Sequence, residues 1–453
     1  MQEDLTQLLY DALEKQDTLQ LEQLVGDLQP ADLAEFIHQE DIETSLKLLT
    51  HLPINRRAEA FGYLDVPTQI KLAQAMTEEG LAQLFMHMNA DERADLFNEM
   101  PEERQQGVLR RMAKEEREDL RRLASYEEGT CGAIMTSDYV TLPQGVKVNR
   151  ALEIVRQTAP NAETIYQIYI LDAAMQLVGT VSLRELILAK PTTEVDTVMT
   201  SDVVSVSVHD LQEEAARKIS RYDILALPVI DDQQRLVGII TYDDAMDVAE
   251  AEATEDIHKG ASVGPLDEGF AKAKISSLYR RRINWLVLLV FANILSGAGI
   301  AFYEEIIESY VVLVFFLPLL VASGGNAGAQ ASTLMIRGLA TGDVGARDWG
   351  KLLGRELIVS ASLALTMALA ISGIGFWRGG LDIALLVAYS MFAIVIVGSM
   401  IGMSLPFILN KLGWDPATAS GPLVTSIADI IGVLIYFAIA SAILDLPMAA
   451  SVT

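Results

Sequence analysis

The sequence predicts a multidomain protein: an all-α helical solenoid, a duplicated α+β unit and a linking acidic helix precede a bundle of five membrane-spanning helices. Three observations lead to this prediction. Apolar runs of about 20 residues, the length that crosses a bilayer, occur only after residue 282. Short amphipathic segments recur along the first 125 residues, and a pair of motifs is repeated within residues 131–250. We therefore divide the chain into 1–130, 131–195, 196–250, 251–279 and 280–453.

Most of the negative charge lies in the part of the chain before the predicted membrane spans. The 453 residues carry a net charge of −27, and the apolar residues 283–453 contribute only 10 acids and 6 bases to it. An acidic protein is a poor ligand for nucleic acid, whose phosphates need a basic surface, so we exclude nucleic acid and expect a cation as partner. A single cysteine, Cys131, rules out a disulfide framework.

The first 125 residues read as short helices. Segments such as ADLAEFI, RRAEAFGYL and GLAQLFMHM follow one another at intervals of roughly 10–15 residues. Asp, Asn, Thr or Pro stands at many of the joints, as helix caps do. Each unit would bury its Leu and Met face on its neighbours, which is the arrangement of a solenoid.

Residues 131–250 contain the internal repeat. IMTSDYVTL at 134–142 matches VMTSDVVSV at 198–206, and QLVGTVSLREL at 176–186 matches RLVGIITYDDA at 235–245. Each copy reads as a strand, an amphipathic helix, a buried strand, a hairpin into another strand and a final helix. The repeat resembles a pair of CBS domains. That resemblance implies that the Thr241 hydroxyl and the Asp244 carboxylate hold the ribose of an adenine nucleotide such as ATP.

Basic residues flank the apolar runs on one side of the membrane. Arg280–Arg282, Arg337 and Lys411 lie at predicted cytoplasmic ends, whereas Glu304 follows the first span. The positive-inside rule then places the N-terminus in the cytoplasm and the C-terminus outside, with the spans among the membrane lipids. The N-terminus shows no signal-peptide pattern. The predicted spans are Ile283–Tyr303, Val311–Ile336, Leu353–Trp377, Ile383–Leu409 and Val424–Leu444.

Two features inside the predicted spans are not explained by the need for an apolar membrane helix. Asp429 lies within an apolar run, where an ionised carboxylate is costly, so we expect it to face an aqueous path or a partner. The alternative is that it lies near a helix end and reaches the membrane–water interface. The glycines of the run VASGGNAGAQAS are expected to break the second span, freeing carbonyls that, with the Asn326 and Gln330 amides, suit a hydrated cation. The alternative is close helix packing through small residues.

The segment that leads into the membrane is densely acidic. Residues 243–256 contain Asp243, Asp244, Asp247, Glu250, Glu252, Glu255 and Asp256. A charge run is usually a solvated face. However, repulsion at this density would be relieved by a divalent cation that bridges several carboxylates.

The chain as a whole resembles the MgtE family of bacterial magnesium transporters. The specific strings are PLLVASGGNAGAQASTLMIRGLATGDV, EAEATEDIHK and DPATASGPLVTSIADIIG. The resemblance implies a homodimer that conducts Mg²⁺ along its two-fold axis, between the second and fifth spans. The pore aspartate of the family falls on Asp429, with Gly325, Asn326 and Thr425 beside the ion path.

The resemblance also implies regulatory Mg²⁺ sites that close the path when cytosolic Mg²⁺ is high. The acidic helix at 251–279 is then the plug helix of the family. One departure is Leu211, where some relatives have an acid, so one site is expected to be weaker or differently built. The implied metal ligands are Glu59, Asp91, Asp95, Glu213, Asp223, Asp244, Asp247, Glu252, Glu255, Asp256 and Asp415.

Other functions remain as alternatives. A coupled divalent-cation exchanger would share these membrane segments. A non-transporting CBS-type membrane sensor would need neither Asp429 nor a broken span. A membrane enzyme is disfavoured because the spans contain no His and no visible nucleophile–base pair, so we expect no enzymatic activity.

Overall fold

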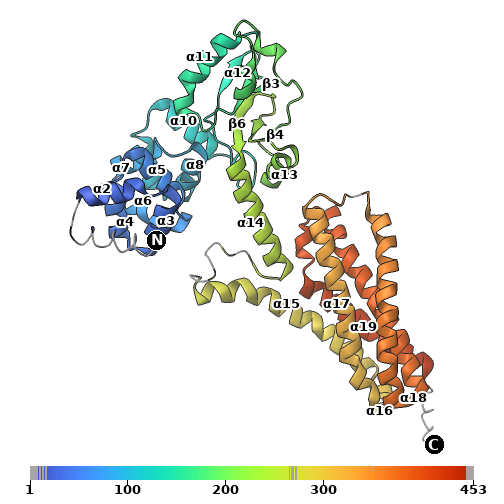
Figure 1. Cartoon of the computed structure of the whole chain (residues 1–453). Helices are drawn as coiled ribbons and strands as arrows, with labels where there is room; N and C mark the ends of the chain where they lie inside the picture. Colours follow the sequence, from blue (N-terminus) through green and yellow to red (C-terminus); the bar gives the residue numbers. More distant parts are fainter. Residues whose placement is uncertain are drawn as a thin grey trace, which may run out of the picture. The chain divides into compact units, whose positions relative to one another are not determined.

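The computed structural model describes residues 18–264, 273–345 and 347–444, together with Leu9, Ala12, Lys15, Leu266 and Phe270. The chain forms two compact units, Met1–Glu250 and Ala251–Thr453. Figure 1 labels most of the elements of each unit.

The N-terminal part of the first unit is a helical solenoid, as predicted. Its helices alternate between two layers, because α3, α5, α7 and α9 contact one another in succession and α4, α6, α8 and α10 do the same. Asp41, Asp65 and Thr77 each accept a backbone N–H at a helix start. The helices are α2 (Thr18–Asp27), α3 (Pro30–Gln39), α4 (Ile42–Thr50), α5 (Ile54–Gly62), α6 (Val66–Ala75), α7 (Glu78–Phe85), α8 (Ala90–Glu99), α9 (Glu102–Leu109) and α10 (Lys114–Leu123).

Two three-stranded sheets follow, one for each copy of the repeat. In both, the first strand pairs in parallel with the second, which pairs antiparallel with the third. The first copy contains β1 (Thr141–Pro143), α11 (Val148–Thr158), β2 (Gln167–Leu171), β3 (Leu177–Ser182) and α12 (Leu183–Leu188). The second contains β4 (Val206–Ser207), α13 (Gln212–Tyr222), β5 (Ala226–Ile230), β6 (Leu236–Thr241) and the start of α14 (Tyr242–Gly260).

The two copies interlock reciprocally. Thr136 of the first copy forms a backbone bridge to Ile239 of the second, and Thr200 of the second does so to Thr180 of the first. The methionine before each bridging threonine lies against a glycine of the opposite copy, Met135 on Gly238 and Met199 on Gly179, where a Cβ atom would overlap the sulfur. The repeated Met-Thr and Val-Gly pairs are therefore two halves of one packing contact.

The solenoid packs on the repeat region within the first unit. Arg122 of α10 donates to the carbonyl of Val237 at 2.9 Å, and the Ser137 hydroxyl donates to Asp119 at 2.7 Å. The hydrophobic core is continuous from Leu33 of α3 to Val229 of β5.

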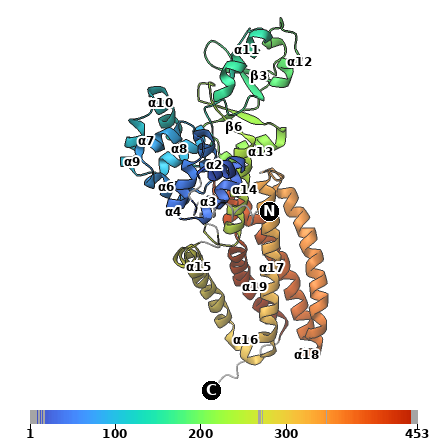
Figure 2. The same ribbon diagram turned by 60° about the vertical axis from the view of Figure 1, so that its left-hand side comes forward.

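Every regular element in the described part of the second unit is a helix. It begins with the second half of α14 and contains α15 (Ile275–Phe302), α16 (Glu304–Ser309), α17 (Val312–Ala340), α18 (Trp349–Lys411) and α19 (Gly421–Ile443). Within the described part, four of these helices are long and apolar enough to cross a membrane. Figure 2 shows α17, α18 and α19 side by side, and α17 contacts both others while α15 contacts α19.

α18 consists of two helical arms. Its 63 residues would extend roughly 95 Å, about three times the ~30 Å apolar core of a bilayer. Gly380, with φ 76° and ψ −163°, adopts a conformation that suits glycine and reverses the chain. The arms pack against each other: a Cβ on Gly375 would lie 2.9 Å from the Cα of Ala384, and Ser399 donates to the buried carboxylate of Glu356.

The predicted break in the second span is wrong. α17 continues through Gly324, Gly325 and Gly328 without interruption. These glycines instead allow close packing: a Cβ on Gly328 would lie 2.7 Å from the carbonyl oxygen of Gly398, and one on Gly402 would overlap the carbonyl of Gly328. Contact between helices offsets the weak helix propensity of glycine. The carbonyls of this run are not freed by unwinding, and the alternative of small-residue packing is confirmed.

Candidate functional site

Six carboxylates from three segments gather in the first unit. Asp91, Glu92 and Asp95 belong to α8; Glu163 precedes β2; Asp243 and Asp244 begin α14. We call this group the acidic centre. Its members are neighbours electrostatically, since the charge of Asp91 raises the pKa of Glu92, Glu163 and Asp244. The centre therefore joins the solenoid to both copies of the repeat.

The acidic centre is strongly desolvated. Burial is the main reason that the pKa values of these carboxyl groups are raised, and repulsion between the carboxylates raises them further. The pKa is about 8 for Glu92 and Glu163, about 7 for Asp244 and about 6 for Asp91. Ionising all of these groups in the folded unit costs free energy. A proton or a cation would lower that cost.

Two oxygens of the centre are orphaned. Among the described residues, Asp91 Oδ1 and Glu163 Oε2 are buried and accept no hydrogen bond. A buried unsatisfied oxygen is costly, and hard oxygens of this kind are the ligands that Mg²⁺ and Ca²⁺ prefer. No three His, Cys, Asp or Glu side chains within the described ranges lie close enough to form a complete metal cage. The donor set fits an ion that keeps most of its water.

The structure brings together only some of the predicted regulatory residues. Asp91, Asp95 and Asp244 meet in the acidic centre. Glu59 lies exposed on α5, Glu213 and Asp223 lie at the start and end of α13, and Asp247 is exposed one turn beyond Asp244. The prediction missed Glu92, Glu163 and Asp243 as members of the centre. Glu92 and Asp243 adjoin predicted ligands in sequence, but nothing local points to Glu163.

The predicted nucleotide pair forms a local contact. The Thr241 hydroxyl donates to Asp244 Oδ2 at the start of α14. In the first copy, Ser182 and Glu185 form a reciprocal capping box at the start of α12. Both pairs thus stabilise the first turn of a helix. Asp244 also belongs to the acidic centre.

A third group of predicted residues lies in the second unit. Lys259, in the last turn of α14, donates to Asp415 Oδ2 at 2.5 Å and forms an ion pair with Glu255 at 2.7 Å. Burial alone would lower the pKa of Lys259, but its hydrogen bonds to Asp415 and Glu255 raise it above its usual value. Burial and then the charge of Asp415 raise the pKa of Asp256. The Lys259 ammonium group is therefore shared by the carboxylates of Glu255 and Asp415.

Asp429 of α19 faces α17 in the membrane bundle. Its Oδ1 is buried and, among the described residues, accepts no hydrogen bond. A Cβ on Gly325 would lie 3.4 Å from that oxygen and 2.8 Å from the Cγ2 methyl of Thr425. Three of the four predicted pore residues thus meet, while Asn326 lies on an exposed side of α17.

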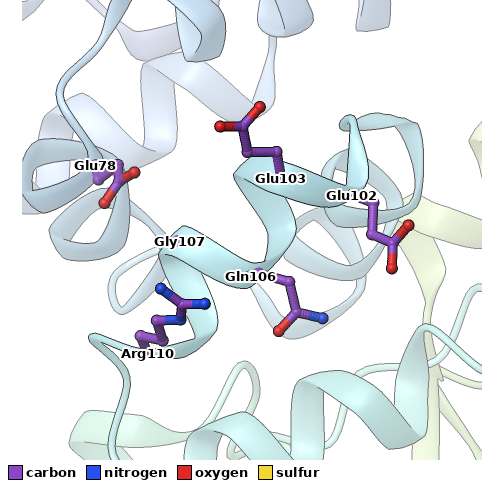
Figure 3. A pocket seen from close by; sticks show the side chains of 6 residues that line it. All are labelled: Glu78, Glu102, Glu103, Gln106, Gly107 and Arg110. Carbon is purple, nitrogen blue, oxygen red and sulfur yellow. The ribbon is translucent and has the colours of Figure 1, made fainter.

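A separate polar pocket lies in the solenoid. Its volume is about 490 Å³, and Figure 3 shows its side chains, which come from α7, α9 and the residue that follows α9. Glu78, which lines the pocket, forms an ion pair with Arg111 at 2.5 Å. None of the predicted ligands lines it; the lining residues are Glu78, Glu102, Glu103, Gln106, Gly107 and Arg110.

These features define a class of protein: a multi-span membrane protein whose cytosolic part combines a helical domain, a CBS pair and buried carboxylates. Family models confirm each part. The model for the MgtE intracellular N domain matches residues 28–129, CBS domains match 131–191 and 195–251, and MgtE, a divalent cation transporter, matches 317–439. The chain belongs to the MgtE family.

Individual relatives agree. The chain is 42% identical over 323 residues to the magnesium transporter MgtE of Thermus thermophilus, covering 71% of this chain and 72% of the relative. It is 38% identical over 321 residues to the protein of the same name from Bacillus subtilis, covering 71% of each. A solved cytosolic domain of the Mg²⁺ channel MgtE in complex with ATP matches with a TM-score of 0.52 and 35% identity, covering 54% of this chain and 99% of that one.

Proposed function

We propose that this protein carries Mg²⁺ across the cell membrane into the cytoplasm. The observation that supports this most directly is Asp429, whose orphaned oxygen faces Gly325 and Thr425 between two apolar helices. A carboxylate at that depth is expensive without a cation or water. Mg²⁺ binds through one or two carboxylates and retains its other waters, so Asp429 would hold a hydrated ion, with Asn326 and the Thr425 region shaping the path.

The path requires a second copy of the chain. One Asp429 supplies a single negative charge for a divalent ion, whereas two copies that face each other across a two-fold axis supply two. The reversal at Gly380 supports five crossings, with two of them contributed by α18. Five crossings would put the two termini on opposite sides of the membrane. The basic residues at the inner ends of the spans favour the N-terminus and the CBS pair in the cytoplasm and the C-terminus outside.

Cytosolic Mg²⁺ would regulate the path by feedback. Bound ions would offset the repulsion among the cytosolic carboxylates and favour the closed state, to the extent that they bind it better than the open one. The ligands proposed for these ions are Glu59, Asp91, Asp95, Glu213, Asp223, Asp244, Asp247, Glu252, Glu255, Asp256 and Asp415. The second half of α14 would act as the plug.

The CBS pair would bind an adenine nucleotide. Thr241 and Asp244 are the residues proposed to hold its ribose, and the similar cytosolic domain solved with ATP supports this assignment. Because Asp244 also belongs to the acidic centre, nucleotide and Mg²⁺ would influence each other's binding.

Uptake by cells that lack other Mg²⁺ importers tests the conduction role. Asp429→Ala and the isosteric Asp429→Asn should reduce Mg²⁺ uptake to background at low external Mg²⁺, with unchanged amounts of protein in the membrane. Asp382→Asn, which neutralises an exposed carboxylate beside Gly380, is the matched control and should leave uptake near normal. Normal uptake by the Asp429 variants would refute the pore assignment.

A further inference from the structure

A carboxyl group is buried between the two arms of α18. Glu356 lies on the first arm, about two turns after the helix begins at Trp349, and it is 9% exposed. Its Oε1 accepts a hydrogen bond from the hydroxyl of Ser399 on the second arm, a residue that is 2% exposed. An ionisable side chain is costly inside an apolar bundle and marks a functional position there. Conduction through Asp429 alone gives Glu356 no role.

The second arm of α18 also supports α17. Gly398 and Gly402 lie four residues apart on one face of this arm. A Cβ on Gly398 would overlap the carbonyl of Gly324, and one on Gly402 would overlap that of Gly328. Ser399 stands between the two glycines in the chain, on the neighbouring face of the same helix. The arm that Ser399 ties to Glu356 therefore touches α17 backbone to backbone.

α17 in turn forms the wall opposite Asp429. Gly325 follows Gly324 in this helix, and a Cβ on Gly325 would lie 3.4 Å from Asp429 Oδ1 and 2.8 Å from Thr425 Cγ2. The contacts that lead from Ser399 to Asp429 thus involve backbone atoms and short side chains. Such contacts relax little, because protein interiors are close-packed. A shift of the second arm along the first would displace the wall that Asp429 faces.

We propose that Glu356 is a positioning residue for the conduction path. A hydrogen bond depends on direction as well as distance, so the bond from Ser399 fixes the register of the two arms more narrowly than apolar packing does. This register holds α17 at the spacing from α19 that lets Asp429 accommodate a hydrated ion. The inference rests on the proposed conduction through Asp429 and adds a residue that controls which ion fits there.

Two substitutions separate this role from a purely structural one. Glu356→Gln keeps an oxygen that can accept from Ser399, so it should conduct as the wild type does. Glu356→Leu removes the acceptor, and the Ser399 hydroxyl can then turn to a carbonyl of its own helix. Replacing a buried polar group by an apolar one is often neutral for stability when no partner is left unpaired. The melting temperature of Glu356→Leu in detergent should therefore stay close to that of the wild type, while its ion selectivity changes.

The test measures Mg²⁺ uptake by cells that lack other Mg²⁺ importers, with and without competing Ca²⁺. Glu356→Leu and Ser399→Ala should each raise the external Mg²⁺ concentration for half-maximal uptake severalfold. Both should also make uptake more sensitive to Ca²⁺, whose flexible coordination tolerates a displaced wall. The double variant should be little worse than either single one, since both lose the same bond. Ser362→Ala, which removes an exposed hydroxyl bonded within the first arm, should match the wild type.

Two results would overturn the inference. Wild-type half-saturation and Ca²⁺ sensitivity in Ser399→Ala would show that the bond does not control the path, and this smaller change decides the matter even where Glu356→Leu fails to fold. A Glu356→Gln variant as impaired as Glu356→Leu would show that the carboxyl group acts by its charge and not by accepting from Ser399. Neither result bears on conduction itself, which the uptake of the Asp429 variants tests separately.

Discussion

Lys259 and Asp415 form a 2.5 Å ion pair within the second unit, between the last turn of α14 and the residue that caps the short 3₁₀ helix Pro416–Thr418. Two further contacts lie at the same junction: the Ser262 and Ser420 hydroxyls are 2.6 Å apart, and Lys259 also pairs with Glu255. An ammonium group thus already neutralises two of the carboxylates proposed to bind regulatory Mg²⁺. Lys259 and Mg²⁺ should compete for the same oxygens.

Replacing Lys259 should therefore make the protein more sensitive to Mg²⁺. In Lys259→Gln, Glu255 and Asp415 lose their counter-charge, so the cytosolic Mg²⁺ concentration that half-inhibits transport should fall severalfold. Patch recording with Mg²⁺ varied on the cytosolic side measures this directly. Lys274→Gln removes an exposed lysine before α15 and should leave the inhibition unchanged. An unaltered half-inhibitory concentration in Lys259→Gln would show that no competition occurs.

The acidic centre should make stability depend on pH. The pKa of Glu92 rises from 4.5 to about 8 and that of Asp244 from 3.8 to about 7 in the folded unit. Because the folded values lie above the unfolded ones, the stabilisation is complete below pH ~4 and is lost as pH rises through 7 and 8. Without Mg²⁺, the melting temperature of the cytosolic unit within the full-length protein should fall by a few degrees between pH 6 and 9.

Glu92→Gln provides the control for this pH effect. The amide cannot ionise, so the slope between pH 6 and 9 should become shallower, while Glu79→Gln on the exposed start of α7 should retain it. Saturating Mg²⁺ should also flatten the slope in the wild type, because the cation supplies the positive charge that protons supply at lower pH. A wild-type melting temperature that does not change with pH would contradict the desolvation of this group.

Gly238→Ala should destabilise the CBS pair. The added methyl would overlap the Met135 sulfur and approach the Thr136 carbonyl at 3.0 Å, an overpacking that typically costs about 1–3 kcal/mol. Met135→Ala in the same chain should restore part of the loss by making room. Chemical denaturation followed in the far ultraviolet measures both variants, and equal stability of Gly238→Ala and wild type would contradict the packing.

Gly402→Ala should disrupt the membrane bundle more severely. Its methyl would overlap the Gly328 carbonyl, which belongs to the backbone and cannot turn aside. A lower yield of monodisperse protein and a melting temperature reduced by several degrees are expected in detergent. Gly373→Ala, where a Cβ meets nothing within 4 Å, should behave as wild type. Tolerance of alanine at residue 402 would mean that α17 and α18 do not pack this closely.

Local pattern was enough to predict much of this architecture. The periodic apolar residues of the solenoid, the two copies of the repeat and the apolar runs after residue 282 correspond to helices, paired sheets and long membrane helices. The density of acids near residue 244 coincides in the structure with one side of the acidic centre. Each of these signals depends on residues close in sequence, whose spacing is itself the determinant of burial.

Contacts between distant segments decided the rest. Whether Gly328 would break a helix or allow two helices to touch depended on Gly398 and Gly402, about 70 residues away. Glu163 joined the acidic centre because the loop before β2 meets the start of α8, a contact with no local signature. By itself, the sequence determined which segments are helical, apolar or acidic, because propensity and periodicity are local. Only the tertiary structure decided which carboxylates lie near one another and which form an ion pair with a lysine. Desolvation and charge pairing depend on the side chains that pack around each carboxylate, and these come from distant parts of the sequence.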